Sequence, residues 1–341
     1  MLDQAYQFNT QTKAMHCEPY GNGHINSTFL VTNKAKERYI LQKINKHVFK
    51  NPEALMKNVV MVTEHLRNAG MSNILRVVPC IDGASYHVDA DGEYWRMYDF
   101  VKDSIFVDMP EGPEDMHQCG LAIGGFINGM ADFDAHKLSE TIPHFHDTPW
   151  RYRTLHEAIS NDVMGRVKLA QPEIEFALSR ESFAKLLLGL QSNGDMPTRV
   201  THNDCKINNV LLHHQTRKAL CVTDLDTVMP GLAVTDFGDA IRNGAATAAE
   251  DETNLEKVNF SLEMYEAYRA GFLNACPSLN PCEIEHMPHG AKMMMLECGV
   301  RFLTDYLCGD TYFKIHRENH NLDRCRTQFK MVAETEAKLA I

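Results

Sequence analysis

One short β-like island interrupts a C-terminal region whose apolar spacing otherwise predicts helices. From about Pro110 onward, four segments have a long helical period: EDMHQCGLAIGGFINGMADF, EIEFALSRESFAKLLLGLQ, NLEKVNFSLEMYEAYRAGFL and EIEHMPHGAKMMMLECGVRFLTDYL. Between the second and the third, RVTHND, NNVLLH, the polar turn HQTRK and ALCVTD predict a loop and two strands, the second ending at Asp224. A hairpin returns the end of its second strand to the preceding loop, so polar residues of the loop and of the strand end are expected to lie together.

The first hundred residues have a different pattern, because short β-branched runs are separated by turn dipeptides such as NG and DG. The runs that predict strands are INSTFLVT, RYILQKI, ILRVV, ASYHV and EYWRMYDFV. One helix is expected among them, with Asn51 as its N-cap, Pro52 in its first turn and Gly70 as its stop. The simplest architecture is therefore α+β and bilobal, with a small β-rich, nucleotide-binding N-lobe over residues 1–101 and a large, mainly helical C-lobe over residues 102–341.

Charge and composition exclude several classes of protein. The 34 Lys and Arg residues against 45 Asp and Glu residues leave a net charge of −11, and no dense basic tract occurs, so nucleic acid is not an expected partner. No apolar stretch approaches the roughly 20 residues that a membrane span needs. The ten cysteines are scattered, without a CxxC pair or a secretory leader, which predicts reduced thiols and a cytoplasmic location.

The island carries residues suited to phosphoryl transfer. His202, Asp204 and Asn209 form the pattern H-x-D-x-x-x-x-N, and Asp224 ends the next strand. This chemistry needs a carboxylate that orients and deprotonates the attacking hydroxyl, and oxygen ligands for the metal that neutralises the nucleotide phosphates. We expect Asp204 to be the base, and Asn209 and Asp224 to hold Mg²⁺ for ATP. Asp226 lies on the same side of an extended chain as Asp224, and it is either a further metal carboxylate or a structural residue.

A second motif imitates the metal site of a protein kinase. Asp236 to Gly238 spell Asp-Phe-Gly, the string that carries the metal-binding aspartate in protein kinases. Here, however, the aspartate opens a predicted helix and does not end the strand paired with NNVLL. We therefore assign the metal to Asp224, and expect Asp236 and Asp239 to cap that helix and to brace the catalytic loop.

Two segments of the N-lobe are candidates for contact with the nucleotide. Gly21 and Gly23 lie in YGNGH, which precedes a predicted strand, and the backbone of such a loop is suited to cover phosphates. A plain hairpin turn needs the same residues. We also expect Phe100 and Val101, where the two lobes join, to contact the nucleotide.

Lys43 ends the predicted strand RYILQKI on the same face as Tyr39 and Leu41. From there its ammonium group could reach the nucleotide phosphates, although surface solvation is an alternative. The usual partner of such a lysine is a glutamate of the following helix. Glu53 and Glu64 lie within about 20° of each other on an ideal helix, so the facing direction does not choose between them.

These motifs together resemble the aminoglycoside phosphotransferase and choline kinase superfamily, through THNDCKINNVLL followed by VTDLD. A protein-kinase activation segment ending in Ala-Pro-Glu is absent. The resemblance is closer to the N-acetylhexosamine 1-kinases, through YGNGHINSTFLV, ILQKINKHVFKNPEALM, WRMYDFV, DLDTVMPG, DFGDAIR, RFLTDYLCGDTYFK and ENHNLDRCRTQ. These blocks span about residues 20 to 330 and imply a protein-kinase-like fold.

The resemblance implies transfer of the terminal phosphate of ATP to the anomeric hydroxyl of N-acetylglucosamine or N-acetylgalactosamine, with the base and metal ligands named above. It also implies a sugar site formed by His24, Thr227 and Arg301. The chain departs from the family pattern at Lys43, where arginine is also accepted. In addition, no glutamate occupies the middle of the helix that starts at Pro52, where many relatives place the partner of the lysine.

A neutral sugar fits the residues of the island, which offer neither an aromatic cage nor a dense acidic pocket for a cationic substrate. The main alternative is another small-molecule kinase of the same superfamily, acting on another sugar or on an amino alcohol such as choline or homoserine. The 17 His residues also allow a non-enzymatic metal-binding protein, but their spacings match no standard zinc arrangement.

Overall fold

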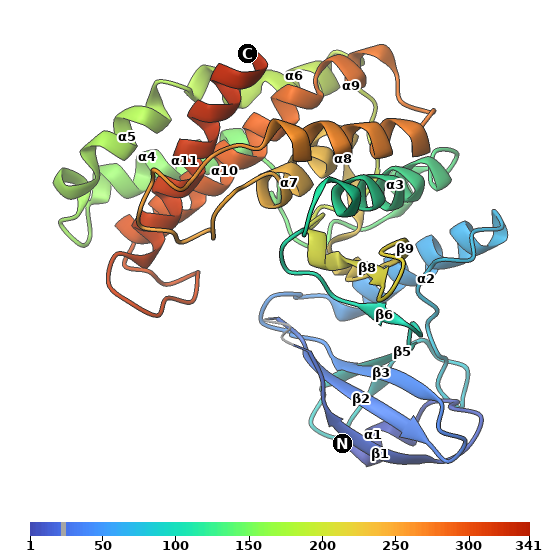
Figure 1. Ribbon diagram of the computed structural model, residues 1–341. Coiled ribbons are helices and arrows are strands. Elements are labelled where there is room, and N and C mark those ends of the chain that lie inside the picture. Colours follow the sequence, from blue (N-terminus) through green and yellow to red (C-terminus); the bar gives the residue numbers. More distant parts are fainter. Residues whose placement is uncertain (22–24) are drawn as a thin grey trace.

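The computed structural model describes residues 1–21 and 25–341. Figure 1 shows a β-sheet at one end of the molecule and a larger group of helices at the other, with helix α2 (Pro52–Asn68) between them. The expected fold class is confirmed, since a β-rich N-terminal part precedes a mainly helical C-terminal part. The division between residues 101 and 102 stays a proposal. It is supported by β6 (Ser104–Ile105), which pairs with a strand of the C-terminal part.

Five antiparallel strands form the N-terminal sheet in the order β1-β2-β3-β5-β4. Their bounds are β1 (Ala14–Pro19), β2 (Ser27–Asn33), β3 (Arg38–Lys43), β4 (His87–Val88) and β5 (Tyr94–Asp99). The sequence pattern does not predict β1. The strand expected at ILRVV is wrong, because that segment makes only isolated bridges, from Ile74 to Val222 and from Val77 to Tyr98. It runs between two different sheets and pairs with one residue of each.

The two faces of this sheet have different surroundings, because side chains alternate along a strand. Tyr39 and Leu41 of β3 belong to a small apolar cluster on one face, which also receives α1 (Leu2–Ala5). Gln42 lies on the other face, where its side chain accepts hydrogen bonds from Arg96 of β5. That second face is turned toward the C-terminal part, since Arg96 also contacts a residue there.

Helix α2 begins as the sequence predicts, because Asn51 Oδ1 accepts a hydrogen bond from Ala54 N at 3.0 Å and Pro52 occupies the first turn. Within the helix, the side chain of Asn58 donates hydrogen bonds to the carbonyl oxygens of Ser139 at 2.7 Å and of Val228 at 3.0 Å. The apolar face of α2 belongs to the large core of the C-terminal part, through Leu55, Met56, Val59, Val62 and Leu66. The helix is therefore fixed to the C-terminal part, although two of the five strands of the sheet, β4 and β5, follow it in sequence.

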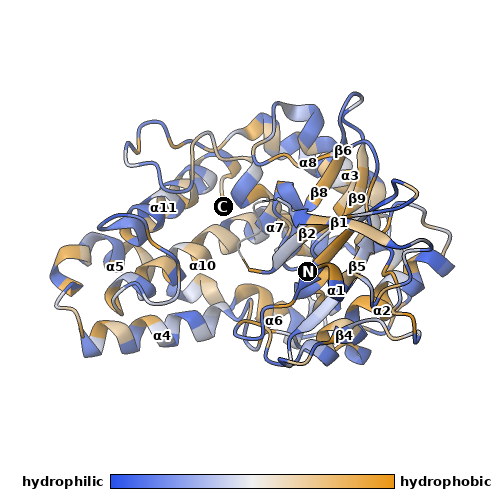
Figure 2. Ribbon diagram, turned by 90° about the horizontal axis from the view of Figure 1, so that it is seen from below, coloured by the Kyte–Doolittle hydropathy of each residue, from blue (hydrophilic) through white to orange (hydrophobic). Residues whose placement is uncertain are grey.

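The C-terminal part is built around α10 (Met287–Leu307), most of which is buried. The other helices are α3 (Pro113–Gly129), α4 (Thr148–Asn161), α5 (Gln171–Leu178), α6 (Leu186–Ser192), α7 (Ala233–Gly244), α8 (Leu262–Ala275), α9 (Pro281–Glu285) and α11 (His320–Leu339). Helix α10 packs against α4, α7 and α11, while α3 packs against α8. In Figure 2, α10 is coloured mainly in the hydrophobic range, whereas α4 at the edge carries both colours.

Some helix predictions need correction. The segment EIEFALSRESFAKLLLGLQ forms α5 and α6 with a 3-10 turn between them, and not one helix. After α5, Ser179 Oγ and Arg180 Nη1 both donate to the carbonyl of Phe176, at 2.8 and 3.2 Å, and such contacts compete with a further helical turn. Helix α8 starts only after Ser261, whose side chain caps Met264 N at 3.3 Å.

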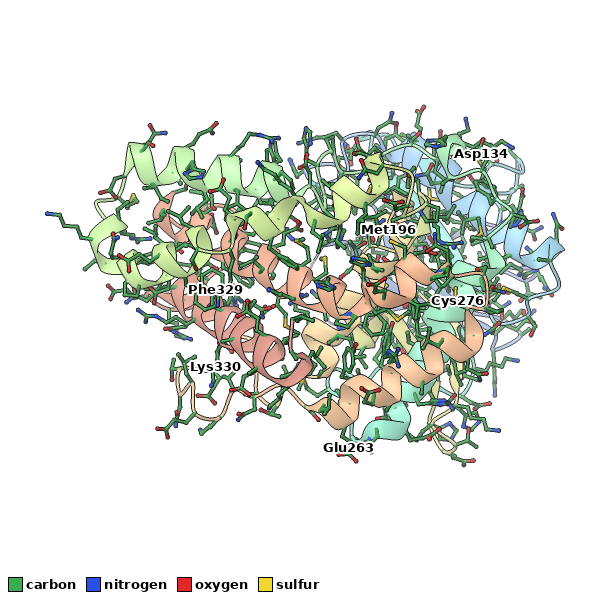
Figure 3. All side chains as sticks on the ribbon, turned by 90° about the horizontal axis from the view of Figure 1, so that it is seen from above. Asp134, Met196, Glu263, Cys276, Phe329 and Lys330 are labelled. Atoms are coloured by element: carbon green, nitrogen blue, oxygen red, sulfur yellow. The ribbon has the colours of Figure 1, made fainter. Side chains whose placement is uncertain are left out.

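Helices α4 and α11 are absent from the sequence-based prediction. Of two adjacent residues of α11, Phe329 faces the core and Lys330 faces the surface (Figure 3). Phe329 is buried and stacks on Phe176 of α5, with ring centroids 4.7 Å apart, whereas Lys330 Nζ donates to Glu334 at 2.8 Å. Helix α11 thereby closes one side of the core over α5 and α10.

The β-like island forms as the sequence predicts. Strand β8 (Val210–His213) pairs antiparallel with β9 (Ala219–Val222), and β6 adds a third strand beside β8. Before the hairpin, β7 (Arg199–Thr201) pairs with β10 (Met229–Gly231), which follows the hairpin. These pairings hold both ends of the segment 202–228, which contains the predicted base and the predicted metal ligands.

The ten cysteines are all free thiols, which confirms that prediction. Free thiols are typical of proteins from reducing compartments. Within the described residues, none of the helices is both long enough and apolar enough to span a membrane.

Candidate active site

Asp204 and Asn209 lie in the loop that joins β7 to β8. Asn209 Nδ2 donates to the backbone carbonyl of Asp204 at 2.8 Å and to its carboxylate Oδ2 at 3.2 Å. Asn209 is buried, whereas Asp204 is partly exposed. The structure thus brings the predicted base next to the first predicted metal ligand, and leaves the Asp204 carboxylate accessible to a substrate.

Asp224 lies two residues beyond the end of β9 at Val222, whereas the sequence predicted that the strand ends at Asp224, and it has a left-handed backbone, with φ 56° and ψ 60°. The preceding residue is tied to the catalytic loop, because Thr223 N donates to the carbonyl of Asn209 at 2.8 Å. Although the Asp224 side chain keeps contact with solvent, the protein packed around it, and then the charges of Asp226 and Asp204, raise its pKa to about 7. The carboxylates of Asp226 and Asp204 therefore lie close enough to Asp224 to disfavour its negative charge.

Asp226 is buried, and both of its carboxylate oxygens have protein partners. Arg96 Nη1 donates to Oδ1, and Asn26 Nδ2 donates to Oδ2 at 2.6 Å. Its backbone carbonyl accepts from Thr141 Oγ1 at 3.0 Å. A direct contact between Asp226 and a metal stays a prediction, and it would use the remaining lone pair of an oxygen that already accepts a hydrogen bond.

Asp236 and Asp239 brace the catalytic loop, as the sequence predicts, but neither caps the helix, because α7 begins at Ala233 with Leu232 as its N-cap. The carboxylate of Asp236 accepts hydrogen bonds from the backbone amides of His202 at 2.7 Å and Asn203 at 2.8 Å. Asp239 accepts from the backbone amide of Cys205 at 2.8 Å. Both aspartates are buried within α7, so they hold the loop from behind.

The rest of the Asp-Phe-Gly string is also structural. Phe237 is fully buried in the core. Gly238 allows α7 to approach α10 closely, since a Cβ atom at this position would lie 2.2 Å from the carbonyl oxygen of Gly290. Phe237 and Gly238 therefore have structural roles, and Gly238 permits the close crossing of α7 and α10.

Lys206 is a cation beside the base that the sequence reasoning missed. The charge of Asp204 raises the pKa of Lys206 more than burial lowers it. Its position two residues after Asp204 was the available signal, because this spacing places a lysine on the loop that carries the base. A lysine there is suited to contact the phosphoryl group in transfer.

The expected nucleotide contacts are described in part. Gly23 and His24 lie outside the described residues. Gly21 has φ 72°, in the left-handed region that favours glycine. Phe100 and Val101 lie between β5 and β6 and form the connection between the sheet and the C-terminal part, as expected.

Lys43 lies on the face of β3 that packs on the small apolar cluster, as its predicted alternation requires. That face is turned away from the C-terminal part, and Gln42 occupies the side facing it. Among the described residues, Lys43 makes no ion pair with Glu53 or Glu64, and Glu53 accepts a hydrogen bond from Tyr94 at 3.2 Å. The structure therefore argues against Lys43 as the phosphate contact.

A buried bridge connects the catalytic loop to α10. His146 Nε2 lies 3.0 Å from the carbonyl of Asn203, and His146 Nδ1 lies 3.0 Å from Glu297 Oε1. Thr148 Oγ1 donates to the second oxygen of Glu297 at 2.6 Å. Burial opposes a charged imidazole, but the hydrogen bond and the charge of Glu297 raise the pKa of His146. Both ring nitrogens face oxygen acceptors, so the protonated ring satisfies both.

Arg301 lies one helical turn after Glu297 on α10. Its guanidinium group lies over three aromatic rings, 5.8 Å from the centroid of Phe145, 5.9 Å from that of Tyr312 and 5.4 Å from that of Phe313. The bridge through Glu297 and His146 leads from this helix to the catalytic loop. Arg301 therefore lies on the helix that this bridge connects to the catalytic loop.

Thr227 packs against the back of the catalytic loop. Its Oγ1 donates to the carbonyl of His202 at 2.7 Å, and its own carbonyl accepts from Asn203 Nδ2 at 2.9 Å. The hydroxyl proton is thus used within the protein. Contact with a sugar stays a prediction for Thr227, and only a lone pair of the hydroxyl oxygen remains for it.

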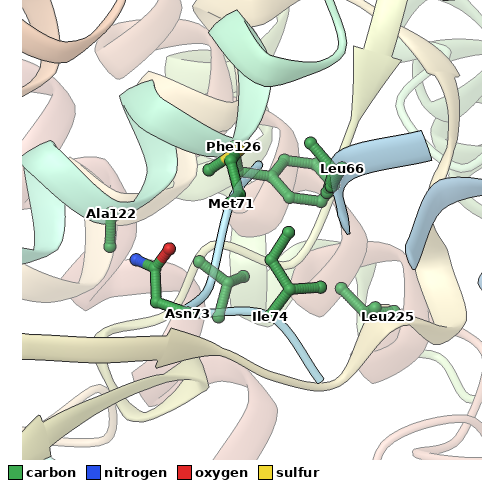
Figure 4. Close-up of a pocket in the computed structure, with 8 residues that line it drawn as sticks. Leu66, Met71, Asn73, Ile74, Ala122, Phe126 and Leu225 are labelled. Carbon is green, nitrogen blue, oxygen red and sulfur yellow. The ribbon is translucent and has the colours of Figure 1, made fainter. Parts of the chain in front are cut away.

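An apolar cavity between α2, α3 and the hairpin is too small for a substrate. It has a volume of about 10 Å³ and is lined by Leu66, Met71, Asn73, Ile74, Ala122, Phe126, Val222 and Leu225 (Figure 4). It lies where α2 packs on the C-terminal core, and we interpret it as a packing defect.

The profile of the phosphotransferase enzyme family matches residues 16–270 of the chain. The chain belongs to this family. The match contains the catalytic loop, the hairpin and the two braces on α7, so the geometry above belongs to a phosphotransferase.

Solved structures similar to this phosphotransferase show the same protein-kinase-like fold. An aminoglycoside phosphotransferase from Alicyclobacillus acidocaldarius has a TM-score of 0.69 at 13% identity, covering 100% of this chain and 94% of its own. The amicoumacin kinase hAmiN, in complex with AMP-PNP and Ca²⁺, has a TM-score of 0.65 at 13% identity, covering 99% and 92%. The choline kinase from Cryptosporidium parvum has a TM-score of 0.58 at 15% identity, covering 95% and 90%.

The residues of this phosphotransferase fit a hard divalent cation. Asn209 Oδ1 and the Asp224 carboxylate are oxygen donors of the kind that Mg²⁺ prefers, and neither accepts a hydrogen bond among the described residues. A cation would also favour the charged form of Asp224, whose pKa is raised by burial and then by the charges of Asp226 and Asp204. In the described part of the chain, no three His, Cys, Asp or Glu side chains gather in a metal-binding cluster.

Proposed function

We propose that this phosphotransferase transfers the γ-phosphate of ATP to the anomeric hydroxyl of an N-acetylhexosamine, such as N-acetylglucosamine or N-acetylgalactosamine. The product is the sugar 1-phosphate. The observation that carries the phosphoryl transfer is the contact of Asn209 with the Asp204 carboxylate, beside Asp224. The choice of acceptor rests on the resemblance to the N-acetylhexosamine 1-kinases.

In the proposed reaction Asp204 orients the anomeric hydroxyl and accepts its proton. Asn209 and Asp224 hold Mg²⁺, which neutralises charge on the nucleotide phosphates when it is bound. Lys206, on the same loop as Asp204, contacts the phosphoryl group that is transferred. Asp236 and Asp239 act only by fixing the backbone of this loop.

The acceptor in this proposal is a neutral sugar. The anomeric hydroxyl is the most acidic one of a free reducing sugar, so it makes the least demand on a partly exposed carboxylate such as Asp204. Arg301 would donate hydrogen bonds to the sugar, and the rings of Phe145, Tyr312 and Phe313 fix its guanidinium group. His24 and Thr227 are the further proposed sugar contacts.

The test is an assay of the protein with ATP, Mg²⁺ and a panel of free sugars and amino alcohols, in which phosphorus NMR locates the phosphate on the product. We expect N-acetylglucosamine or N-acetylgalactosamine to be phosphorylated at position 1. Preferred phosphorylation of choline, ethanolamine or homoserine would instead assign the protein to the alternative class of kinases.

A methyl glycoside of N-acetylglucosamine is the matched control, because its anomeric oxygen is blocked. It is expected to bind as a competitive inhibitor and to accept no phosphate. Arg301→Ala is expected to raise KM for the sugar and to leave KM for ATP nearly unchanged. Phosphorylation of the methyl glycoside at the rate of the free sugar would show that a different hydroxyl is the acceptor.

A further inference from the structure

On β3, the uncharged side chain of Gln42 lies where protein kinases have a lysine that contacts the nucleotide. In protein kinases a lysine of β3 reaches the nucleotide phosphates and pairs with a glutamate of the following helix. In this phosphotransferase Gln42 is the last β3 residue that faces the C-terminal part, and Lys43 faces the small apolar cluster. On α2, Met56 lies near this place, with its sulfur 4.0 Å from Arg96 Nη1.

Arg96 on the neighbouring strand β5 brings a positive charge to this place. It lies opposite Gln42 in the strand register, and its Nε and Nη2 donate to Gln42 Oε1 at 3.0 and 2.9 Å. Its Nη1 donates to Asp226 Oδ1. Arg96 is 1% exposed and Asp226 is 2% exposed, so the pair is almost completely shielded from water.

The carboxylate of Asp226 also accepts a hydrogen bond from Asn26, at the end of the glycine-containing loop. Asn26 Nδ2 donates to Asp226 Oδ2 at 2.6 Å, and Asn26 Oδ1 accepts from the backbone amide of Asn45 at 2.9 Å. Asp226 therefore joins β5 and the start of β2 to the loop that carries Asp224.

A purely stabilising role explains this arrangement poorly. The cost of removing two charges from water offsets most of the attraction within a buried ion pair, so such pairs contribute little to stability compared with apolar packing. Asp226 lies two residues after Asp224, so the pair connects β5 to the segment that carries this proposed metal ligand. A fixed guanidinium group at this place holds the segment that carries Asp224 in position.

We propose that Arg96 is a positioning residue for the metal–nucleotide site, which acts through Asp226 and takes the part that the lysine of β3 and the glutamate of the helix play in protein kinases. The inference rests on the phosphoryl transfer of the proposed function, but not on its sugar acceptor. Arg96 itself need not touch the nucleotide, because its guanidinium group is already used by Gln42 and Asp226.

The experiment measures binding of AMP-PNP by isothermal titration at several Mg²⁺ concentrations, without any acceptor. Arg96→Met is expected to weaken the apparent affinity for Mg²⁺ by about 10- to 100-fold, the usual effect of removing a partner of a metal-site residue. Arg96→Lys keeps the charge but not the forked geometry, and is expected to restore part of the affinity. Arg180→Met is the control, since it removes an arginine that also donates two hydrogen bonds to one carboxylate, that of Glu336 in α11, in a less buried pair with 22% of each side chain exposed.

A double variant separates positioning from stability. Arg96→Met alone leaves Asp226 buried and unpaired, which destabilises the fold. The double variant Arg96→Met with Asp226→Asn carries no buried charge, so it is expected to fold and still to need about 10- to 100-fold more Mg²⁺. Wild-type Mg²⁺ dependence in the folded double variant would overturn the inference.

Two further outcomes would also contradict it. One is a larger loss of Mg²⁺-dependent binding in Lys43→Met than in Arg96→Met, which would make Lys43 the cation of the site. The other is failure of the wild-type protein to bind AMP-PNP with Mg²⁺. Failure to phosphorylate any sugar, with binding and its Arg96 dependence intact, would contradict only the acceptor.

Discussion

Two aspartates only 32 residues apart illustrate how surroundings decide the role of one residue type. Asp204 is partly exposed, and its carboxylate accepts a hydrogen bond only from the Asn209 side chain among the described residues. Asp236 is fully buried, and both of its oxygens accept backbone amides of the catalytic loop. The first can exchange a proton with a substrate, whereas the second is occupied by the protein.

Asp204→Asn is expected to lower turnover by about a hundred- to ten-thousand-fold, because an amide cannot accept the proton of the attacking hydroxyl. Nucleotide binding and melting temperature are expected to stay near the wild-type values, since the amide is isosteric. Steady-state kinetics and a titration with AMP-PNP measure the two effects. Turnover within threefold of the wild type would remove Asp204 from the role of base.

Asp236→Ala is expected to destabilise the fold and to leave Mg²⁺ binding measurable in the folded protein. Two buried backbone amides lose their acceptor, and each unsatisfied group costs about 1–3 kcal/mol. Urea denaturation measures the loss, with the exposed Asp195→Ala as a control expected within about 0.5 kcal/mol of the wild type. Loss of metal binding without loss of stability would make Asp236 the metal ligand.

Among the helices, the crossing of α7 and α10 depends on Gly238. Gly238→Ala is expected to destabilise the protein by about 1–3 kcal/mol or more, because the new Cβ would lie 2.2 Å from the carbonyl oxygen of Gly290 and the helices must move apart. Gly125→Ala in α3 is the control, since nothing lies within 4 Å of its Cβ position and alanine favours a helix by about 1 kcal/mol. Equal effects in thermal denaturation would contradict the close crossing.

The bridge from the catalytic loop to α10 predicts a pH dependence of stability. The pKa of His146 is raised above its usual value, about 6.5 in an unfolded chain, so the bridge contributes fully below about pH 6.5. That contribution is lost as the pH rises through the higher pKa of the folded state. The difference in unfolding free energy between the wild type and His146→Gln is therefore expected to shrink from about pH 6 to pH 9. A difference independent of pH would show that the ring is not charged in the bridge.

On the scale of the whole molecule, ligand binding is expected to stabilise the fold. A ligand at a concentration of 100 times its Kd stabilises the folded state by about 2.7 kcal/mol. AMP-PNP with Mg²⁺ should therefore raise the melting temperature, and EDTA should remove most of that rise. In Asp224→Ala the Mg²⁺-dependent part is expected to disappear, since one of the two proposed metal ligands is missing. A rise that persists in Asp224→Ala would place the metal elsewhere.

Much of this architecture is determined by residues that are close together in sequence, so it could be predicted from the sequence alone. The cap at Asn51, the hairpin of β8 and β9 and the helical period of α10 depend on near neighbours in sequence. The catalytic loop was predictable for the same reason, because Asp204 and Asn209 share one loop and a hairpin returns Asp224 to it. Asp236 was expected both to cap a helix and to brace the loop, and only the bracing is found, since α7 begins at Ala233.

Contacts between distant segments could not be derived in this way. The facing direction of Lys43 was predicted, but only the packed sheet decided which of its faces is turned toward the C-terminal part. The pairing of Arg96 with Asp226 joins residues 130 positions apart, and no local pattern encodes it. The sequence by itself therefore determined the local elements and the loop of the base, whereas the tertiary structure decided which cation serves that loop, because only packing brings β5 beside the hairpin.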